Sequence, residues 1–223
     1  MKFSERLFQK VNCIWEKTHE HPFVVGLGRG DLPVESFIRY MKQDYVFLID
    51  YSKLFAFGTV KARDVETMAA FAKLLDETLN GEMDLHRQYA KRFGITEQDL
   101  EGTEPTPINL AYTRYMLNVA QNGSLEELIS SLLPCMWSYW EIGKTLAENY
   151  QNSSNHLLYG DWVKMYSSDE FGSLAIWLID LLDQLTEGKP ERELAVLEEH
   201  FLITSRFEYM FWDMVYEGGD WPV

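Results

Sequence analysis

The chain has 223 residues, of which 46% are hydrophobic, so it is long enough for one large domain or two small ones with a sizeable core. Its formal net charge of −15 argues against a nucleic acid or an anionic membrane surface as partner, because both attract clustered Lys and Arg. The two cysteines, Cys13 and Cys135, do not make a disulfide framework. We see no signal peptide and no segment that could span a bilayer, and we therefore expect a reduced, cytoplasmic setting.

Helix start and stop signals divide the first half of the chain. Asp31-Leu32-Pro33 opens a predicted helix that runs to about Lys61, with proline near the first turn, where its missing N–H costs nothing. Asp64 begins a second predicted helix, which runs to about Phe93 and is followed by Gly94.

The second half of the chain has similar signals. Ser124 and Glu127 have the spacing of a capping box before an apolar run. Two further helices are predicted, from Ser168 to about Gly188 and from Pro190 to about Tyr216. Alternating strand patterns, internal repeats and linkers are absent. We therefore predict one all-α domain over residues 1–223, a helical bundle with about seven or eight helices.

The predicted helix around Cys135 has an apolar face that is interrupted by a thiol. Helical spacing places Cys135 and Tyr139 on that face, one turn apart. Pro134 leaves the carbonyl of Ser130 without its usual donor, so either the helix bends there or a new helix begins. Cys135 itself either packs as a small hydrophobic residue or attacks a substrate.

Two other predicted helices carry a carboxylate within an apolar face. Asp44 shares a face with Phe47 and Tyr51, and Glu208 shares one with Phe201. Since carboxylates are rarely buried without a partner, each acid either pairs with Arg or Lys or points into a ligand pocket. A thiol and two acids that each interrupt an apolar face favour a shared internal pocket lined with aromatic rings.

Four ordered segments carry a resemblance to a known family. They are "HPFVVGLGRGDLPVESFIRYMKQDY" (21–45), "LLPCMWSYWEIG" (132–143), "YGDWVKMYSSDEF" (159–171) and "EYMFWDM" (208–214). In them, and over essentially its whole length, the chain resembles the thiaminase II (TenA) family, which has the haem-oxygenase-like all-α fold. The resemblance implies hydrolysis of 4-amino-5-aminomethyl-2-methylpyrimidine to its hydroxymethyl form with release of ammonia, which salvages degraded thiamine. It also implies cleavage of thiamine into its pyrimidine and thiazole halves, and a homotetramer.

The resemblance implies roles for individual residues. Cys135 is the implied nucleophile and Glu208 the implied proton donor and acceptor. The implied substrate-binding residues are Asp44, Tyr139, Tyr166 and Tyr112, and we add Phe47 and Tyr51 from the aromatic face of Asp44. A thiolate would add to an electron-poor ring carbon, and protonation of a ring nitrogen would make that carbon more electrophilic. We expect the partner to be a small-molecule pyrimidine or thiamine, with no cofactor and no metal.

Two other functions are alternatives to pyrimidine hydrolysis. The first is a haem or di-iron redox protein of the same fold, because Glu16 and His19 have Glu-x-x-His spacing and His21 lies nearby. A di-iron bundle, however, needs a second such motif and further inward carboxylates. The second is a non-catalytic pyrimidine-binding protein, which would not need Cys135. We predict that Cys13, in an amphipathic first helix, is a packing cysteine.

Many members of the resembled family carry a tyrosine where this chain has Phe47, and the tyrosine hydroxyl is thought to help activate the cysteine. We predict that Phe47→Tyr raises the turnover number for ammonia release, because it supplies that hydroxyl. An unchanged or lower turnover number would show that the missing hydroxyl does not limit the reaction.

Overall fold

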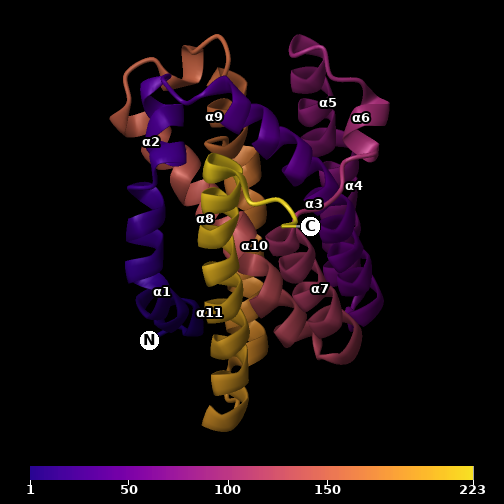
Figure 1. The fold of residues 1–223 in the computed structure, drawn as a ribbon. Helices are drawn as coiled ribbons and strands as arrows, with labels where there is room; N and C mark the ends of the chain where they lie inside the picture. The colour runs from indigo at the N-terminus through magenta and orange to yellow at the C-terminus, as the bar shows by residue number, and fades with distance from the viewer. Residues whose placement is uncertain (223) are drawn as a thin grey trace. The chain divides into compact units, whose positions relative to one another are not determined.

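The computed structural model describes residues 1–222, and every regular element in that range is a helix (Figure 1). The all-α prediction is therefore confirmed. Residue contacts divide the chain into two compact units. The first unit contains residues 1–33 and 129–212, and the second contains residues 34–128 and those from 213 onward. None of the helices in the described range is long and apolar enough to cross a membrane.

The first unit contains the part of the helix that carries the predicted nucleophile, Cys135. Its elements are α1 (Phe3–His19), α2 (Pro22–Arg29), most of α8 (Leu125–Asn149), η2 (Ser153–Asn155), α9 (Gly160–Tyr166), α10 (Asp169–Thr186) and most of α11 (Glu191–Asp213). The predicted start of α10 is confirmed, because the Ser168 hydroxyl accepts a hydrogen bond from the Phe171 N–H at 3.1 Å. The helix α8 runs without a break through Pro134, so no new helix begins there.

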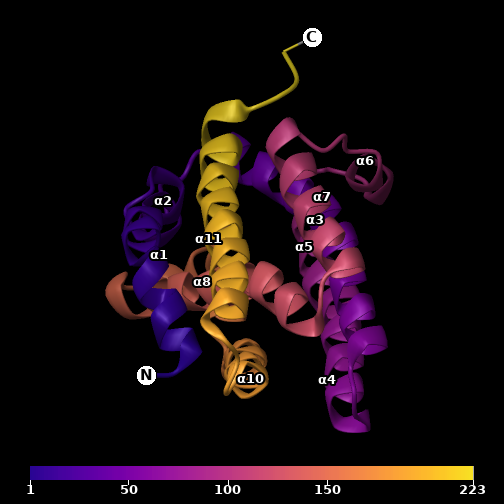
Figure 2. The same cartoon turned by 90° about the horizontal axis from the view of Figure 1, so that it is seen from below.

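In the second unit, α3 (Val34–Lys61) is the central helix. The other elements are α4 (Val65–Asp76), η1 (Glu77–Glu82), α5 (Met83–Arg92), α6 (Glu97–Glu101), α7 (Pro107–Asn122) and η3 (Met214–Gly218). Each of them contacts α3, and Figure 2 shows α5 and α7 beside it. The predicted capping box before α8 is present, because the Ser124 N–H donates to the Glu127 carboxylate at 2.7 Å and the Glu127 N–H donates to the Ser124 hydroxyl at 3.2 Å.

A π-helical turn, η1, interrupts the segment that was predicted as one helix from Asp64 to Phe93. The Met83 N–H donates to the carbonyl of Thr78, five residues back, whereas an α-helical N–H donates four residues back. The prediction of one uninterrupted α-helix is therefore wrong. A second π-helical turn, η3, follows Asp213, so the last α-helix ends before the predicted Tyr216.

The π-turn changes which side chains point inward. The buried face steps from Thr78 to Met83 and continues to His86. In an unbroken α-helix it would pass through Glu82 and Leu85, which are only half-buried. One extra residue in the turn therefore rotates α5 so that His86 lies on the inward face.

The amphipathic helix α1 turns Cys13 outward. Its buried residues, Leu7, Val11 and Trp15, follow helical spacing along one side. Cys13 lies on the other side and is exposed. The prediction of a packing cysteine at this position is therefore wrong.

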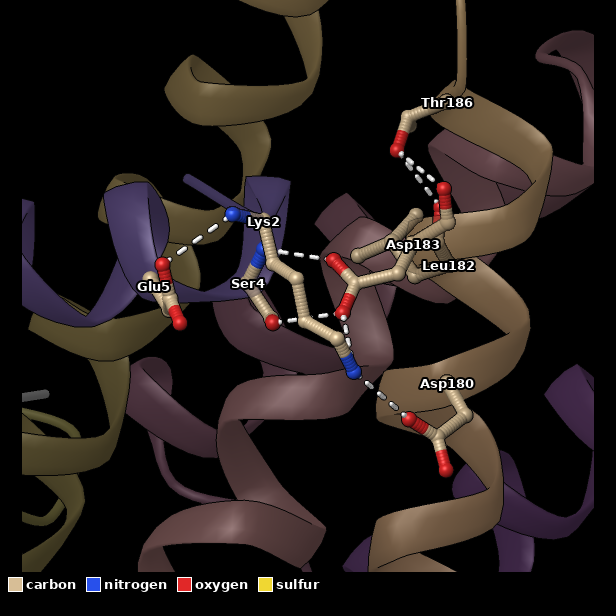
Figure 3. A network of polar contacts seen from close by, with 7 residues as sticks. All are labelled: Lys2, Ser4, Glu5, Asp180, Leu182, Asp183 and Thr186. Carbon is tan, nitrogen blue, oxygen red and sulfur yellow. Dashed lines mark hydrogen bonds and ion pairs between the residues drawn. The ribbon is translucent and has the colours of Figure 1, made fainter.

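The start of α1 is held by two acids of α10 (Figure 3). The Ser4 N–H and the Ser4 hydroxyl both donate to the Asp183 carboxylate, each at 2.7 Å. The Lys2 ammonium lies 3.3 Å from Asp180 and 3.6 Å from Asp183. The Asp183 side chain is only 11% exposed, against 49% for Asp180. Asp183 thus accepts from the Ser4 N–H, which has no partner within α1. The negative charge of Asp183 also lies at the positive end of the α1 helix dipole.

We predict that Asp183→Ala lowers the free energy of unfolding by about 1–2 kcal/mol, the usual cost of a lost helix cap. Asp180→Ala is the matched control and should change it by less than about 0.5 kcal/mol, because its exposed ion pair with Lys2 contributes little. Urea denaturation of both variants measures the difference. Equal effects would contradict the capping role of Asp183.

Candidate active site

Four of the predicted site residues belong to the first unit. Cys135 and Tyr139 lie on α8, Tyr166 is the last residue of α9, and Glu208 lies on α11. All four side chains are buried. The structure thus confirms that the thiol, the two tyrosines and the acid are buried, as their helical spacing predicts.

Tyr139 is the centre of an aromatic cluster. Its ring centroid lies 5.0 Å from that of Tyr166 and 5.1 Å from that of Trp212, and Trp162 lies 4.5 Å from Tyr166. Trp212, one helical turn after Glu208, is not among the predicted site residues. These contacts fix the Tyr139 ring, which offers a stacking face and a hydroxyl one turn after Cys135.

Cys135 and Glu208 lie in the same stretch of packing between α8 and α11. Before them, the Ser130 hydroxyl donates to the carbonyl of Leu197 at 2.6 Å. After them, the ring of Tyr139 contacts the α11 tryptophan. In sequence, these two contacts lie on either side of the thiol on one helix and of the carboxyl group on the other.

A glycine allows α8 to approach the end of α9. A Cβ atom on Gly143 would lie 2.4 Å from the carbonyl carbon of Tyr166, 2.6 Å from its carbonyl oxygen and 2.7 Å from the Ser167 nitrogen. These contacts are too short for any residue other than glycine. Because Gly143 lies one turn after Tyr139, the close approach sets the two tyrosine rings against each other.

The remaining predicted site residues belong to the second unit. Phe47 on α3 is stacked against Tyr51, with ring centroids 5.3 Å apart and planes at 22°. Its centroid lies 5.2 Å from that of Tyr112 on α7. All three rings are buried. The structure therefore brings these three residues together as a single aromatic wall.

Asp44, on α3, is paired with a histidine. Its Oδ2 accepts a hydrogen bond from the Tyr40 hydroxyl at 2.9 Å and lies 2.7 Å from Nε2 of His86. All three side chains are buried. The partner is thus neither Arg nor Lys, and His86 is a site residue that the sequence analysis missed. The signal that could have found it is the spacing within α5, because Met83, His86 and Ala90 are three and four residues apart and share one helical face.

The hydrogen bonds of His86 define where its protons lie. Nδ1 lies 2.9 Å from the carbonyl oxygen of Glu82, which can only accept, so Nδ1 carries a hydrogen. Nε2 faces the Asp44 carboxylate, so one further proton lies between those two atoms. Burial lowers the pKa of His86, but the hydrogen bond and charge of Asp44, together with Glu82, outweigh it and raise the pKa above its ordinary value.

Two residues of the redox alternative, Glu16 and His21, have roles in helix structure. The Glu16 carboxylate accepts a hydrogen bond from Asn12 at 2.7 Å. Nδ1 of His21 accepts one from the Phe23 N–H at 3.1 Å and so caps α2. Within residues 1–222, no three His, Cys, Asp or Glu side chains gather in a way that could hold a metal ion.

Comparisons with known proteins give one family and one fold. The model of the TENA/THI-4/PQQC family matches residues 8–218. An aminopyrimidine aminohydrolase of Halalkalibacterium halodurans is 53% identical over 221 residues, which cover 99% of this chain and 98% of that protein. A solved TenA homologue from P. horikoshii OT3 is 32% identical, with a TM-score of 0.89 over 98% of this chain and 100% of that one.

A more distant structure identifies the fold alone. It is a domain of unknown function with a heme oxygenase-like fold from Shewanella denitrificans, 14% identical, with a TM-score of 0.75. The match covers 96% of this chain and 91% of that domain. The predicted haem-oxygenase-like class is thereby confirmed.

We predict that Gly143→Ala destabilises the fold by about 1–3 kcal/mol, because a methyl group must displace the backbone of Tyr166. The turnover number should fall by about tenfold or more, since small shifts of binding groups are costly. Gly81→Ala is the matched control, because its Cβ would meet only a carboxylate oxygen of Glu77 at 3.5 Å. The two are compared by thermal unfolding and ammonia release. Equal behaviour of the two variants would show that the close approach at Gly143 is not needed.

Proposed function

Because the chain belongs to the TENA/THI-4/PQQC family, as its motifs predict, we propose that it is an aminopyrimidine aminohydrolase. It hydrolyses 4-amino-5-aminomethyl-2-methylpyrimidine to the hydroxymethyl form and releases ammonia, and it also cleaves thiamine. The observation that carries this proposal is the 53% identity, over nearly the full length, to a protein named for aminopyrimidine hydrolysis. The family match passes through both compact units, which supports a single domain over residues 1–223.

In the proposed mechanism, Cys135 is the nucleophile and Glu208 is the proton donor and acceptor. Glu208 protonates a ring nitrogen as the Cys135 thiolate adds to an electron-poor ring carbon. The aromaticity of the ring is then broken, so ammonia leaves from the methylene arm. Water adds to that arm and passes its surplus proton to the released ammonia, Glu208 takes back the proton from the ring nitrogen, and the thiolate is expelled. Support comes from the burial of both side chains and from the contacts between α8 and α11 that flank them in sequence.

The proposed substrate contacts are aromatic rings and one carboxylate. Tyr139 and Tyr166 supply ring faces and hydroxyls to the pyrimidine. Asp44 accepts a hydrogen bond from an exocyclic amine, and its charge strengthens that bond. The wall of Phe47, Tyr51 and Tyr112 is proposed to pack against the ring. The buried positions of all six side chains support these roles, because a planar aromatic ring gains most from dry aromatic surroundings.

Other expectations about the protein stay predictions. The homotetramer and the cytoplasmic location belong to this group, as does the absence of a cofactor. The net charge of −15 is compatible with a neutral or cationic small ligand, such as an aminomethyl pyrimidine or thiamine. Sedimentation analysis of the purified protein tests the homotetramer directly.

The proposed function is tested by ammonia release from the aminomethyl pyrimidine, with thiamine as a parallel substrate. Wild type should release ammonia, and Cys135→Ser should lower the turnover number by about 1,000-fold or more, because it removes the nucleophile. Cys13→Ser, which replaces the exposed cysteine, is the matched control and should keep full activity.

Three other results would contradict parts of this proposal. No ammonia from wild type would exclude the hydrolase and favour the non-catalytic or redox alternative. Substantial activity in Cys135→Ser would exclude the covalent mechanism. Glu208→Gln with unchanged turnover would exclude its role in proton transfer.

A further inference from the structure

The two carboxylate oxygens of Asp44 have unequal surroundings. Both hydrogen bonds that the second unit gives to this carboxylate go to Oδ2. Oδ1 accepts none from the described residues of this unit. The side chain is only 4% exposed, and the lone pairs of Oδ1 have capacity for one or two donors. A ligand N–H that reaches Oδ1 would bond to it in surroundings with little water, where a hydrogen bond is strong.

His86 determines which kind of hydrogen bond Oδ1 can make. Its Nδ1–H is held by the Glu82 carbonyl, so the proton of the pair lies between Nε2 and Oδ2. While that proton stays there, Oδ1 has only lone pairs and acts as an acceptor. Without His86, no neighbouring nitrogen holds a proton at Oδ2. A proton on the carboxyl group is then free to lie on Oδ1, which donates in that form.

The π-turn η1 is what makes this arrangement possible. It supplies the Glu82 carbonyl from its last residue and shifts the inward face of α5 to His86. The histidine is completely buried, and its ring centroid lies 6.2 Å from that of Tyr40. Two hydrogen bonds, one at each ring nitrogen, leave the imidazole no freedom to rotate. π-Helical turns often occur at functional sites, where they redirect a side chain in this way.

We propose that His86 is a positioning residue that makes Asp44 selective for an amino group over a carbonyl group on the pyrimidine. This inference rests on the proposed function and names the group that the site recognises. An amino group donates to Oδ1, whereas a carbonyl oxygen at the same ring position places two acceptors against each other. A site built for one hydrogen-bonding type rejects the other strongly, because a buried polar atom is left unpaired.

The test compares the affinities of two ligands that differ at this one ring position. They are 5-hydroxymethyl-2-methylpyrimidine with a 4-amino group and the same compound with a 4-oxo group, and calorimetry measures both dissociation constants. Wild type should bind the amino compound about 100-fold more tightly or better, as expected for a mismatched buried hydrogen bond. His86→Leu should lower this ratio about tenfold or more, because a protonated Asp44 can donate to the oxo group.

Two further variants separate selectivity from folding. Tyr40→Phe removes the other donor to the same Oδ2 and should keep the ratio within about threefold of wild type, because a neutral hydroxyl does not hold the shared proton. His86→Gln keeps a donor without the charge, and its ratio should fall at least about threefold. It serves as the main variant if His86→Leu does not fold. Affinities are compared only at equal folded fractions, measured by circular dichroism.

The outcomes distinguish this inference from the proposed function. An unchanged ratio in the folded His86 variants overturns the inference, as does an equal fall in Tyr40→Phe. Ammonia release by wild type without preference for the amino compound overturns the inference alone. Neither release nor binding by wild type overturns the proposed function together with the inference.

Discussion

A carboxylate buried among aromatic rings must be compensated, and that requirement organises the second unit. Asp44 lies on the central helix, where removing its charge from water would cost several kcal/mol without a partner. Only a donor that is itself buried can reach it, and His86 and Tyr40 meet this condition. The histidine in turn requires α5 to be rotated by one residue. The packing of α5 on α3 and the π-turn before it therefore follow from one buried charge.

The first unit depends on a different constraint, which is the close approach of the α8 backbone to the end of α9. Its cluster of tyrosine and tryptophan rings packs around Tyr139, and large rings leave little room for adjustment. Gly143 lets the backbone of α9 come near enough for Tyr166 to join this cluster. The Ser130 hydroxyl ties α8 to α11 on the other side of the thiol. Cys135 and Glu208 thus lie within a frame of contacts that do not involve their own reactive atoms.

Local signals in the sequence predict most of the helices and the inward faces. The capping pair of Ser124 and Glu127 and the cap at Ser168 are correct, because caps depend on a few neighbouring residues. The burial of Cys135 and Glu208 is also predicted from spacing alone. Features that depend on distant residues could not be predicted. The contact of Tyr139 with Trp212 and the clearance at Gly143 join separate helices, and neither leaves a periodic signal.

The partner of Asp44 could not be predicted for a different reason. His86 is visible in the sequence, but an α-helical count from Thr78 passes through Leu85 instead. A five-residue step has no reliable signature in residue preference, so the phase of α5 could not be carried over from α4, although Met83, His86 and Ala90 share one face within α5. The outward position of Cys13 is different, because spacing does indicate it. Cys13 lies two residues from both Val11 and Trp15 and therefore on the opposite side of α1.

Because of the π-turn, the number of residues between α4 and α5 determines which side chain of α5 reaches Asp44. Each residue added to or removed from a helix rotates everything after it by about 100°. A related protein with one residue fewer between α4 and α5 would keep its histidine in an alignment and yet present another side chain to the acid. Whether two such proteins recognise the same ring substituent is then decided by the number of residues in a turn, and residue identity at the site does not reveal it.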